Sequence, residues 1–140
     1  MEYISNSLED TKALALRFAK KLPKKSVIAF RGGMGSGKTT FISEVISALG
    51  YNGYVTSPTF NIVNVYNVKY NCYHFDMYRI NSLDDLLSTG YFDYLEDENG
   101  VLFIEWSENL EELPDNTTTI TIKSEDNKRI FIAEGPFCEF

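Results

Sequence analysis

The sequence lacks the features of membrane and exported proteins. No apolar run in its 140 residues approaches the roughly eighteen that a membrane helix needs. The first five residues have neither the basic nor the apolar region of a signal peptide. The two cysteines, Cys72 and Cys138, are too few for a disulfide framework and have no metal-ligand spacing. These absences predict a soluble, cytoplasmic protein with no membrane partner.

Positive charge is also scarce. Lys and Arg number 13 against 20 Asp and Glu, which gives a formal net charge of −7. A protein that binds a nucleic-acid backbone by itself neutralises the phosphates with clustered Lys and Arg. We therefore expect any contact with RNA to run through a partner. The hydrophobic share of 44% and the chain length predict one packed globular domain over residues 1–140.

The first third of the chain predicts a helix, a buried strand, a glycine-rich turn and a second helix. From Ser7 to Leu22, apolar residues beginning with Leu8 recur at steps of three and four, as on one helix face. Residues 27–30, Val-Ile-Ala-Phe, form a short apolar run typical of a buried strand. Residues 39–49 again have helical spacing, and Gly50 is a candidate C-terminal cap.

The rest of the chain predicts more strands and a short helix. Residues 54–76 are rich in Val, Ile, Tyr and Phe, which indicates two or three strands. A short helix over 81–90, capped by Ser82, and a buried strand over 101–104 follow. Two alternating segments around a polar turn at 124–127 predict a C-terminal β-hairpin. The fold class is α/β, with a mixed central β-sheet flanked by helices.

The turn between the first strand and the second helix is a candidate phosphate-binding loop. Residues 32–39, Gly-Gly-Met-Gly-Ser-Gly-Lys-Thr, match the pattern Gly-x4-Gly-Lys-Thr. Backbone N–H groups of such a loop, here at Gly35, Ser36 and Gly37, converge on phosphate oxygens at the positive end of a helix. Lys38 would reach the β and γ phosphates, and the Thr39 hydroxyl would bind Mg²⁺. Strand, loop and helix in this order predict a P-loop NTPase domain.

Magnesium on a triphosphate needs a second anchor, usually an acidic residue that ends a buried strand. Asp76 and Glu105 both follow apolar or aromatic runs, and parallel strands would bring both to the edge where the loop lies. The spacing leaves open which carboxylate touches the metal, directly or through water. We hypothesise attack of water on the γ-phosphate, with Lys38 and Mg²⁺ stabilising the charge and Asp76 or Glu105 orienting the water or the metal.

Four further residues have both a functional and a structural interpretation. Ser57 and Thr59 lie where nucleotide hydrolases place a segment that senses the γ-phosphate, but Ser57 also begins an ordinary Ser-Pro turn. His74, the only histidine, is more typical of a packed or hydrogen-bonded core residue than of a catalyst. Trp106 is more typical of the core as well, although its place after Glu105 would suit an aromatic wall beside the phosphates.

Together these residues resemble one family, the bacterial TsaE ATPases required for the synthesis of threonylcarbamoyladenosine in tRNA. The matching blocks, in the family's order and spacing, are GGMGSGKTT at 32–40, TSPTF at 56–60, HFDMYR at 74–79 and IEW at 104–106. With Thr11 and Arg129, the resemblance covers nearly the whole chain. It implies ATP and Mg²⁺ as cofactors.

The resemblance also implies roles for individual residues. The phosphates are expected to bind at Gly35, Gly37, Lys38, Thr39 and Thr40. Magnesium is expected at Thr39 and Glu105, with Asp76 as a second acidic group near the nucleotide. The adenine is expected beside Thr11 and Arg129, Ser57 and Thr59 are the expected switch segment, and Trp106 is expected to stand beside the site. Two residues depart from the family pattern. Gly33 stands where members usually have an acidic residue, and Ser107 where they usually have proline.

Relatives in this family act in a complex with the enzyme that transfers the threonylcarbamoyl group to adenosine 37 of tRNA, and with that enzyme's dimerising paralogue. They hydrolyse ATP to support repeated turnover of the transferase and do not perform the transfer. The resemblance therefore implies these two protein partners, and contact with tRNA only through the complex. The acidic charge of the chain fits this arrangement.

A loop of this pattern also occurs in other classes of nucleotide-binding protein. A small-molecule kinase shares the loop but needs an arginine-bearing lid, and the arginines at 17, 31, 79 and 129 are scattered. A guanine-nucleotide switch needs an Asn-Lys-x-Asp segment, and residues 127–130 lack the aspartate. A scaffold that binds nucleotide and hydrolyses it only incidentally is compatible with every motif.

Overall fold

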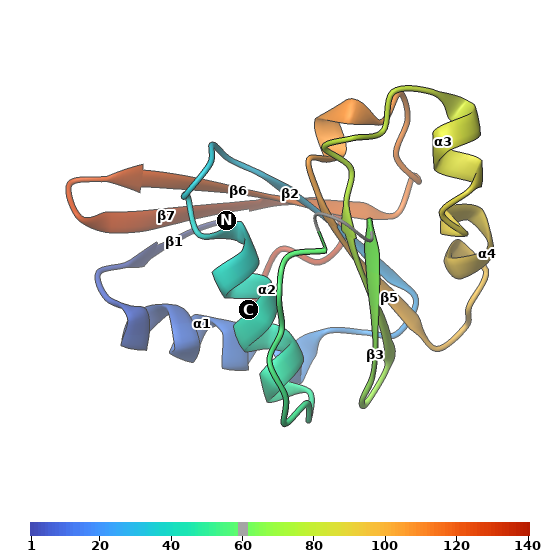
Figure 1. The fold of residues 1–140 in the computed structure, drawn as a ribbon. Helices are drawn as coiled ribbons and strands as arrows, with labels where there is room; N and C mark the ends of the chain where they lie inside the picture. Colours follow the sequence, from blue (N-terminus) through green and yellow to red (C-terminus); the bar gives the residue numbers. More distant parts are fainter. Residues whose placement is uncertain (59–61) are drawn as a thin grey trace.

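The computed structural model describes residues 1–58 and 62–140, and its strands form one seven-stranded sheet (Figure 1). The order across the sheet is β1-β7-β6-β2-β5-β4-β3. The strands are β1 Glu2–Ser5, β2 Ser26–Arg31, β3 Val63–Asn67, β4 Asn71–Asp76, β5 Gly100–Glu105, β6 Thr117–Glu125 and β7 Lys128–Glu134. The helices are α1 Leu8–Lys21, α2 Lys38–Ala48, α3 Leu83–Leu87, α4 Tyr91–Leu95 and the 3-10 turn η1 Ser107–Asn109.

The sheet is mixed, and its parallel part lies in the centre. β2 pairs in parallel with both β5 and β6, and β4 pairs in parallel with β5. The antiparallel pairs β3–β4, β6–β7 and β1–β7 lie toward the two edges. The predicted mixed α/β sheet is therefore confirmed. The prediction that residues 1–140 form a single domain stays a prediction.

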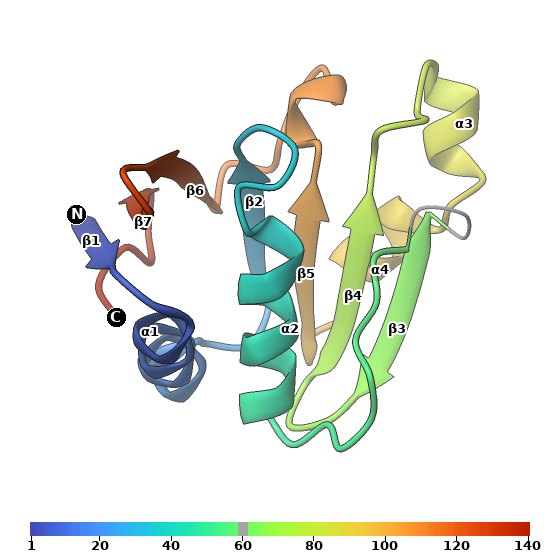
Figure 2. The same ribbon diagram turned by 60° about the vertical axis from the view of Figure 1, so that its left-hand side comes forward.

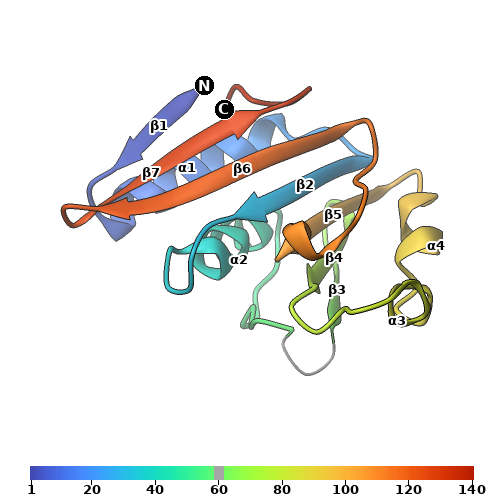
Figure 3. The same ribbon diagram turned by 90° about the horizontal axis from the view of Figure 1, so that it is seen from above.

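Helices cover both faces of the sheet. α1 and α2 lie against one face, and α3 and α4 lie against the other (Figures 2 and 3). Alternate residues of β2 follow this division, because Ile28 packs in the cluster that contains α1 and α2, and Val27 packs in the cluster on the opposite face. A strand covered on both faces is apolar throughout, which is why the runs at 27–30 and 101–104 lack a polar-apolar alternation.

The first helix forms where the sequence predicts it, with one correction. The Ser7 hydroxyl accepts a hydrogen bond from the Asp10 amide at 3.1 Å and caps α1. Leu8 is not buried as its helical spacing suggests, since it is 55% exposed. It lies at the mouth of a cavity lined by Thr11 and Arg129, so no strand covers it. Leu14 joins the buried face of the helix instead.

The second helix ends as predicted at Gly50. This glycine has a φ of +118°, and its amide donates to the Ser47 carbonyl at 3.0 Å. The Tyr51 amide donates to the Ile46 carbonyl at 3.3 Å. Together these bonds satisfy two carbonyls at the end of α2 in the arrangement of a Schellman motif, which favours glycine because the backbone is left-handed.

The C-terminal hairpin is confirmed, and its turn is tight. β6 and β7 pair from Glu125 and Lys128 outward, which leaves only Asp126 and Asn127 in the turn. Both have positive φ, 48° and 65°, as a two-residue turn of the primed type needs. The polar segment 124–127 of the sequence is therefore partly strand.

Three elements escape the sequence patterns, and one predicted helix is shorter than expected. Residues 54–76 contain two strands, and β1, α4 and η1 are additional. These last three span three to five residues each, too few for a periodicity to be visible. α3 covers only Leu83–Leu87, and Leu83 is 63% exposed. No helix among the described residues is long and apolar enough to cross a membrane.

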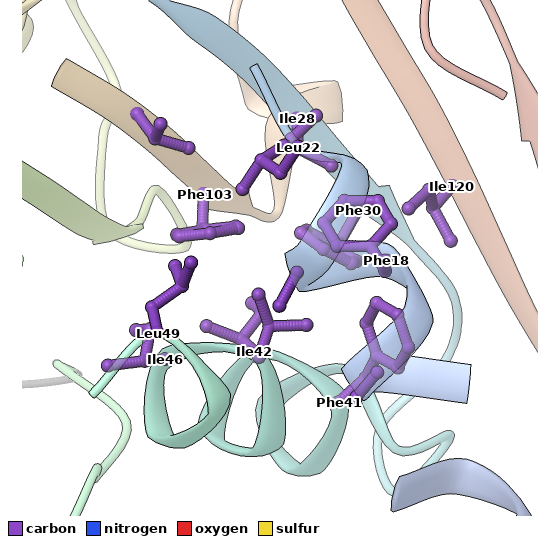
Figure 4. Packing of buried hydrophobic residues seen from close by; sticks show 14 of the residues in the cluster. Phe18, Leu22, Ile28, Phe30, Phe41, Ile42, Ile46, Leu49, Phe103 and Ile120 are labelled. Carbon is purple, nitrogen blue, oxygen red and sulfur yellow. The ribbon is translucent and has the colours of Figure 1, made fainter. Parts of the chain in front are cut away.

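Aromatic side chains fill the space between α1, α2 and the sheet (Figure 4). Phe41 of α2 is fully buried, and its ring centroid lies 5.5 Å from that of Phe18 and 5.0 Å from that of Phe131. The helix that begins at the glycine-rich loop is thus held against both α1 and β7. Its first turn, which carries Lys38 and Thr39, is fixed by this packing.

We predict that Phe41→Ala lowers the free energy of unfolding by about 3–5 kcal/mol, because it leaves a cavity between α1, α2 and β7. Leu8→Ala is the matched control on an exposed position and should cost no more than about 0.5 kcal/mol. Urea denaturation of both variants measures these differences. An equal loss in the two variants would contradict the packing described for α1.

Candidate functional site

The candidate site lies at the carboxyl ends of three parallel strands in the centre of the sheet. In their register Phe30 of β2 lies opposite Glu105 of β5, and Glu105 lies opposite Asp76 of β4. The carboxyl ends of the three strands therefore meet directly below the loop that joins β2 to α2 (Figure 2). This confirms the expectation that both acidic strand ends open onto the edge where the loop lies.

The loop depends on glycine at three positions. Gly32, Gly35 and Gly37 have φ values of +150°, +75° and +105°. A Cβ atom on Gly32 would meet the Ile122 carbonyl oxygen at 2.6 Å, and a Cβ atom on Gly37 would lie 3.4 Å from the Arg129 Nε atom. The loop can follow this path because these three residues have no side chain.

Lys38 begins α2 and its side chain turns back over the loop. Its ammonium group donates to the Gly32 carbonyl at 2.8 Å and lies 4.0 Å from the centre of the Trp106 ring. The residue is only 5% exposed. The charge is therefore held by a carbonyl dipole and an aromatic face, both of which an anion in the loop could replace.

Thr39 and Glu105 are already in contact. The threonine hydroxyl lies 2.9 Å from Oε1 and 3.1 Å from Oε2 of the carboxylate. Two ligands that sit next to each other on a Mg²⁺ octahedron, with bonds of about 2.0–2.1 Å, are about 3 Å apart. The pair therefore fits neighbouring positions around this ion. Among residues 1–58 and 62–140, no group of three or more His, Cys, Asp or Glu is placed to hold a metal.

His74 has a function-related contact that sequence reasoning missed. It is completely buried in β4, as expected for a core histidine, and its Nε2 atom lies 2.6 Å from the Glu105 Oε2 atom. Its Nδ1 atom has no hydrogen-bond partner among the residues that the structure describes. An imidazole with its proton on Nε2 fits both observations, because it donates to the carboxylate and leaves no buried N–H unsatisfied. The available signal was the alternation that places His74 and Asp76 on one strand face.

Asp76 ends the neighbouring strand and is 7% exposed. Its Oδ1 atom accepts a hydrogen bond from the Tyr78 amide at 3.0 Å. The residue thus helps to turn the chain out of β4 while it borders the same cavity as Glu105. The Glu105 carboxylate accepts hydrogen bonds from the Thr39 hydroxyl, whereas the Asp76 carboxylate accepts one from the Tyr78 amide.

Trp106 stands beside the site in an unusual conformation. Its φ of 58° lies in the left-handed region, which costs a residue with a side chain about 1–3 kcal/mol. In this conformation the indole ring lies over the Lys38 ammonium, and its centre is 5.0 Å from the centre of the Tyr78 ring. The residue is half-buried, so the predicted aromatic wall describes its place better than the core does.

Two adjoining cavities bring the predicted site residues together. The larger, about 410 Å³, extends from the loop to Asp76, Glu105, Trp106 and Ser57. The smaller, about 270 Å³, includes Thr11. Three residues, Gly37, Thr40 and Arg129, line both cavities. Every predicted site residue that the structure describes lines one of the two, and Thr59 lies outside the described residues. Seven further residues line the cavities and were missed: Ser5, Ser7, Leu8, Met34, Tyr78, Asn127 and Phe131.

Comparison with known proteins agrees with this geometry. The family model "Threonylcarbamoyl adenosine biosynthesis protein TsaE" matches residues 5–131. The chain belongs to the TsaE family. A tRNA threonylcarbamoyladenosine biosynthesis protein TsaE from Treponema pallidum is 34% identical over 95% of this chain and 100% of its own length. A relative of the same name from Rickettsia prowazekii is 38% identical over 77% of this chain and 75% of its own length.

A solved structure shows the same fold. The crystal structure of Bacillus subtilis YdiB is 32% identical in sequence and superposes with a TM-score of 0.75, covering 94% of this chain and 82% of that one. The TsaE family is a P-loop ATPase family involved in the biosynthesis of threonylcarbamoyladenosine in tRNA, together with other proteins of that pathway. The family resemblance and the α/β fold expected from the sequence are confirmed.

The two departures from the TsaE pattern lie in different surroundings. Gly33 is exposed, and a Cβ atom there would meet no described atom within 4 Å, so the described part of the chain leaves room for the usual acidic side chain. Ser107 is 1% exposed and follows Trp106 at the start of η1. Its hydroxyl has no hydrogen-bond partner in residues 1–58 and 62–140, so a ring at this position would displace no described polar contact of the hydroxyl.

The glycines of this TsaE loop predict a contrast between two identical substitutions. Gly33→Ala should leave stability unchanged or raise it by up to about 1 kcal/mol, because the φ of Gly33 lies outside the left-handed region and its surroundings are open. Gly37→Ala should cost about 1–2 kcal/mol, because its φ is +105°. Thermal melting of the two variants measures the difference, and an equal effect would contradict the loop conformation.

Proposed function

We propose that this chain binds Mg²⁺ and ATP in the two adjoining cavities and hydrolyses ATP as a subunit of the complex that makes threonylcarbamoyladenosine at position 37 of tRNA. In this proposal hydrolysis supports repeated turnover of the transferase subunit, and the chain does not carry out the transfer. The observation that carries the proposal is the contact of Thr39 with Glu105 beside the buried ammonium of Lys38.

The shape of the site supports an ATP molecule whose phosphates and base lie in different cavities. The phosphates fit the larger cavity, where the amides of Gly35 to Gly37 and the start of α2 favour negative charge. The adenine fits the smaller cavity beside Thr11 and Arg129. Thr11 shares a hydrogen bond of 2.6 Å with the Ser5 hydroxyl, and Arg129 donates to the Ser124 hydroxyl at 2.7 Å. Both side chains of the base cavity are therefore held in place.

The proposed chemistry uses contacts that already exist in the free chain. Lys38 exchanges the Gly32 carbonyl for a phosphate oxygen and stabilises the charge that develops during transfer to water. Thr39 and Glu105 would hold Mg²⁺, and the bound ion would supply positive charge beside the phosphate oxygens. His74 keeps the Glu105 carboxylate turned toward Thr39. Asp76, on the neighbouring strand, orients the attacking water.

The proposed partners are the threonylcarbamoyl transferase subunit and its dimerising paralogue, in the cytoplasm. Arg129 lines the cavities but bonds to Ser124 of the neighbouring strand, and we assign it to the base. A charge that stabilises the transition state would then come from a partner, as in other nucleotide hydrolases. A net charge of −7 also favours a division of labour in which the partners hold the RNA.

The first test compares ATP hydrolysis by the chain alone with hydrolysis in the presence of the transferase and its paralogue. The rate should be slow alone and should rise at least about tenfold with the partners, because they complete the site. Lys38→Ala is the control and should weaken ATP binding by about ten- to a hundredfold through loss of a charge-assisted bond. Unaided turnover on the order of tens per second with no partner effect would overturn the proposal and favour a kinase. Binding without partner-dependent hydrolysis would favour a scaffold.

The second test separates the two carboxylates. Glu105→Gln should reduce the gain in ATP affinity that Mg²⁺ brings by about tenfold or more, because the metal loses a charged ligand. Asp76→Asn should change that gain by less than about threefold and should lower the hydrolysis rate. Calorimetric titration with ATP, with and without Mg²⁺, measures both. A larger loss of metal dependence in Asp76→Asn would reverse the assignment.

A further inference from the structure

A groove that shares no lining residue with the nucleotide cavities is formed by residues of α3, α4, η1 and the segment that follows η1. Its volume is about 270 Å³. Ile80, Tyr91 and Leu110 form a buried apolar floor. Leu83 and Phe92 line the groove but remain 63% and 43% exposed. A shallow apolar groove with two exposed large side chains resembles the core of a protein interface.

The hydroxyl of Tyr91 makes the groove more than an apolar surface. Tyr91 is 2% exposed, and its hydroxyl has no hydrogen-bond partner in the described part of the chain. Burial raises the pKa of Tyr91 to about 12, so the phenol stays protonated and is able to donate. The ring is fixed edge-on against Phe75 at 5.7 Å and against Phe92 at 5.2 Å. The hydroxyl is closed off from solvent, so an acceptor supplied from outside the chain could bond to it only when the groove opens.

The chain segment that forms the groove is acidic, and the exposed Arg79 directly precedes it. Residues 80–116, which contain every element that forms it, include eleven of the chain's 20 acidic residues and none of its 13 basic residues. Glu111 and Glu112 line the groove itself and are exposed. Such a rim attracts Lys and Arg and repels a second copy of the same surface. Charge complementarity therefore selects a basic partner and disfavours self-association.

The groove is linked to the nucleotide site through the residues that leave β4. The side-chain amide of Asn109 lines the groove and donates to the Met77 carbonyl at 2.9 Å and the Tyr78 carbonyl at 3.2 Å. Tyr78 packs on Trp106, and Asp76 immediately precedes this segment. A molecule in the groove would thus touch the supports of both Asp76 and Trp106.

We propose that this groove binds a segment of the transferase complex in which an apolar side chain is flanked by Lys or Arg. The apolar side chain lies between Leu83 and Phe92, and the basic residues face Glu111 and Glu112. When the groove opens, a backbone carbonyl of the segment accepts a hydrogen bond from the Tyr91 hydroxyl. This inference rests on the proposed function, since it assigns the partner named there to one surface. It also gives that partner a route to the nucleotide through Asn109.

A charge reversal with a matched control tests the surface. Affinity for the purified transferase–paralogue complex is measured for the full chain, for Glu111→Lys/Glu112→Lys and for Glu134→Lys/Glu139→Lys. The control pair is exposed, makes the same change in net charge at the end of β7 and near the C-terminus, and does not line the groove. The groove variant should bind at least about tenfold more weakly, and the control should stay within about threefold. Neither pair belongs to the nucleotide site, so ATP hydrolysis without partners should be unchanged in both.

Tyr91→Phe tests the hydroxyl separately from the fold. Because the hydroxyl has no partner in the free chain, its removal should not lower the melting temperature. Affinity for the complex should nevertheless fall about three- to tenfold through the lost hydrogen bond. Unchanged affinity in this variant would remove the hydroxyl from the interface.

The outcomes distinguish the surface from the function. If the unaltered chain binds the complex and both charge reversals bind equally well, the groove assignment is wrong and the proposed function stands. If the unaltered chain does not bind the complex, the proposed partner and the groove assignment both fail. If the chain self-associates and Glu111→Lys/Glu112→Lys abolishes that association, the occupant is a second copy and the proposal is overturned.

Discussion

The parallel register of β2, β5 and β4 is the constraint on which the site depends. It sets Phe30, Glu105 and Asp76 side by side at the carboxyl ends of three buried strands, directly below the loop. A shift of one residue in β5 would turn Glu105 to the opposite face of the sheet, away from Thr39 and His74. The apolar packing on both sheet faces prevents this shift, because the shift would also move Phe103 and Ile104 to the opposite faces, out of the clusters in which they pack. Burial of the core therefore fixes the geometry of the polar site.

The free chain holds its two main functional side chains with internal substitutes. The Lys38 ammonium contacts the Gly32 carbonyl and the Trp106 ring, and the Glu105 carboxylate contacts Thr39 and His74. These contacts keep buried charges satisfied without a nucleotide, which matters because an unpaired buried charge is strongly destabilising. They also keep the side chains close to the positions in which they would meet phosphate and metal. Under the proposed function these contacts preorganise the site, and nucleotide binding would need little rearrangement of the backbone.

The sequence predicted the central elements and twelve of the nineteen described residues that line the two cavities, because those features depend on local patterns. The loop, its flanking strand and helix, Glu105 and Asp76 each have a signal within a few residues. Contacts between neighbouring strands have no such local signal. The alternation along β4 places His74 and Asp76 on one face, but only the parallel register brings His74 to Glu105. The exposure of Leu8 and the strained backbone of Trp106 likewise follow from tertiary packing rather than from spacing. Short elements such as α4 are stabilised by the sheet that they cover, and so they are not visible as a pattern.

The central claim is that Thr39, Glu105 and Lys38 form one preorganised site for Mg²⁺ and a triphosphate. A crystal structure of the chain with Mg²⁺ and a non-hydrolysable ATP analogue tests it most directly. The account predicts the triphosphate in the loop, Mg²⁺ about 2.1 Å from the Thr39 hydroxyl and beside Glu105, and the Lys38 ammonium moved from the Gly32 carbonyl to a phosphate oxygen. A nucleotide bound elsewhere, or a metal held away from Thr39 while Lys38 still bonds to Gly32, would contradict the account.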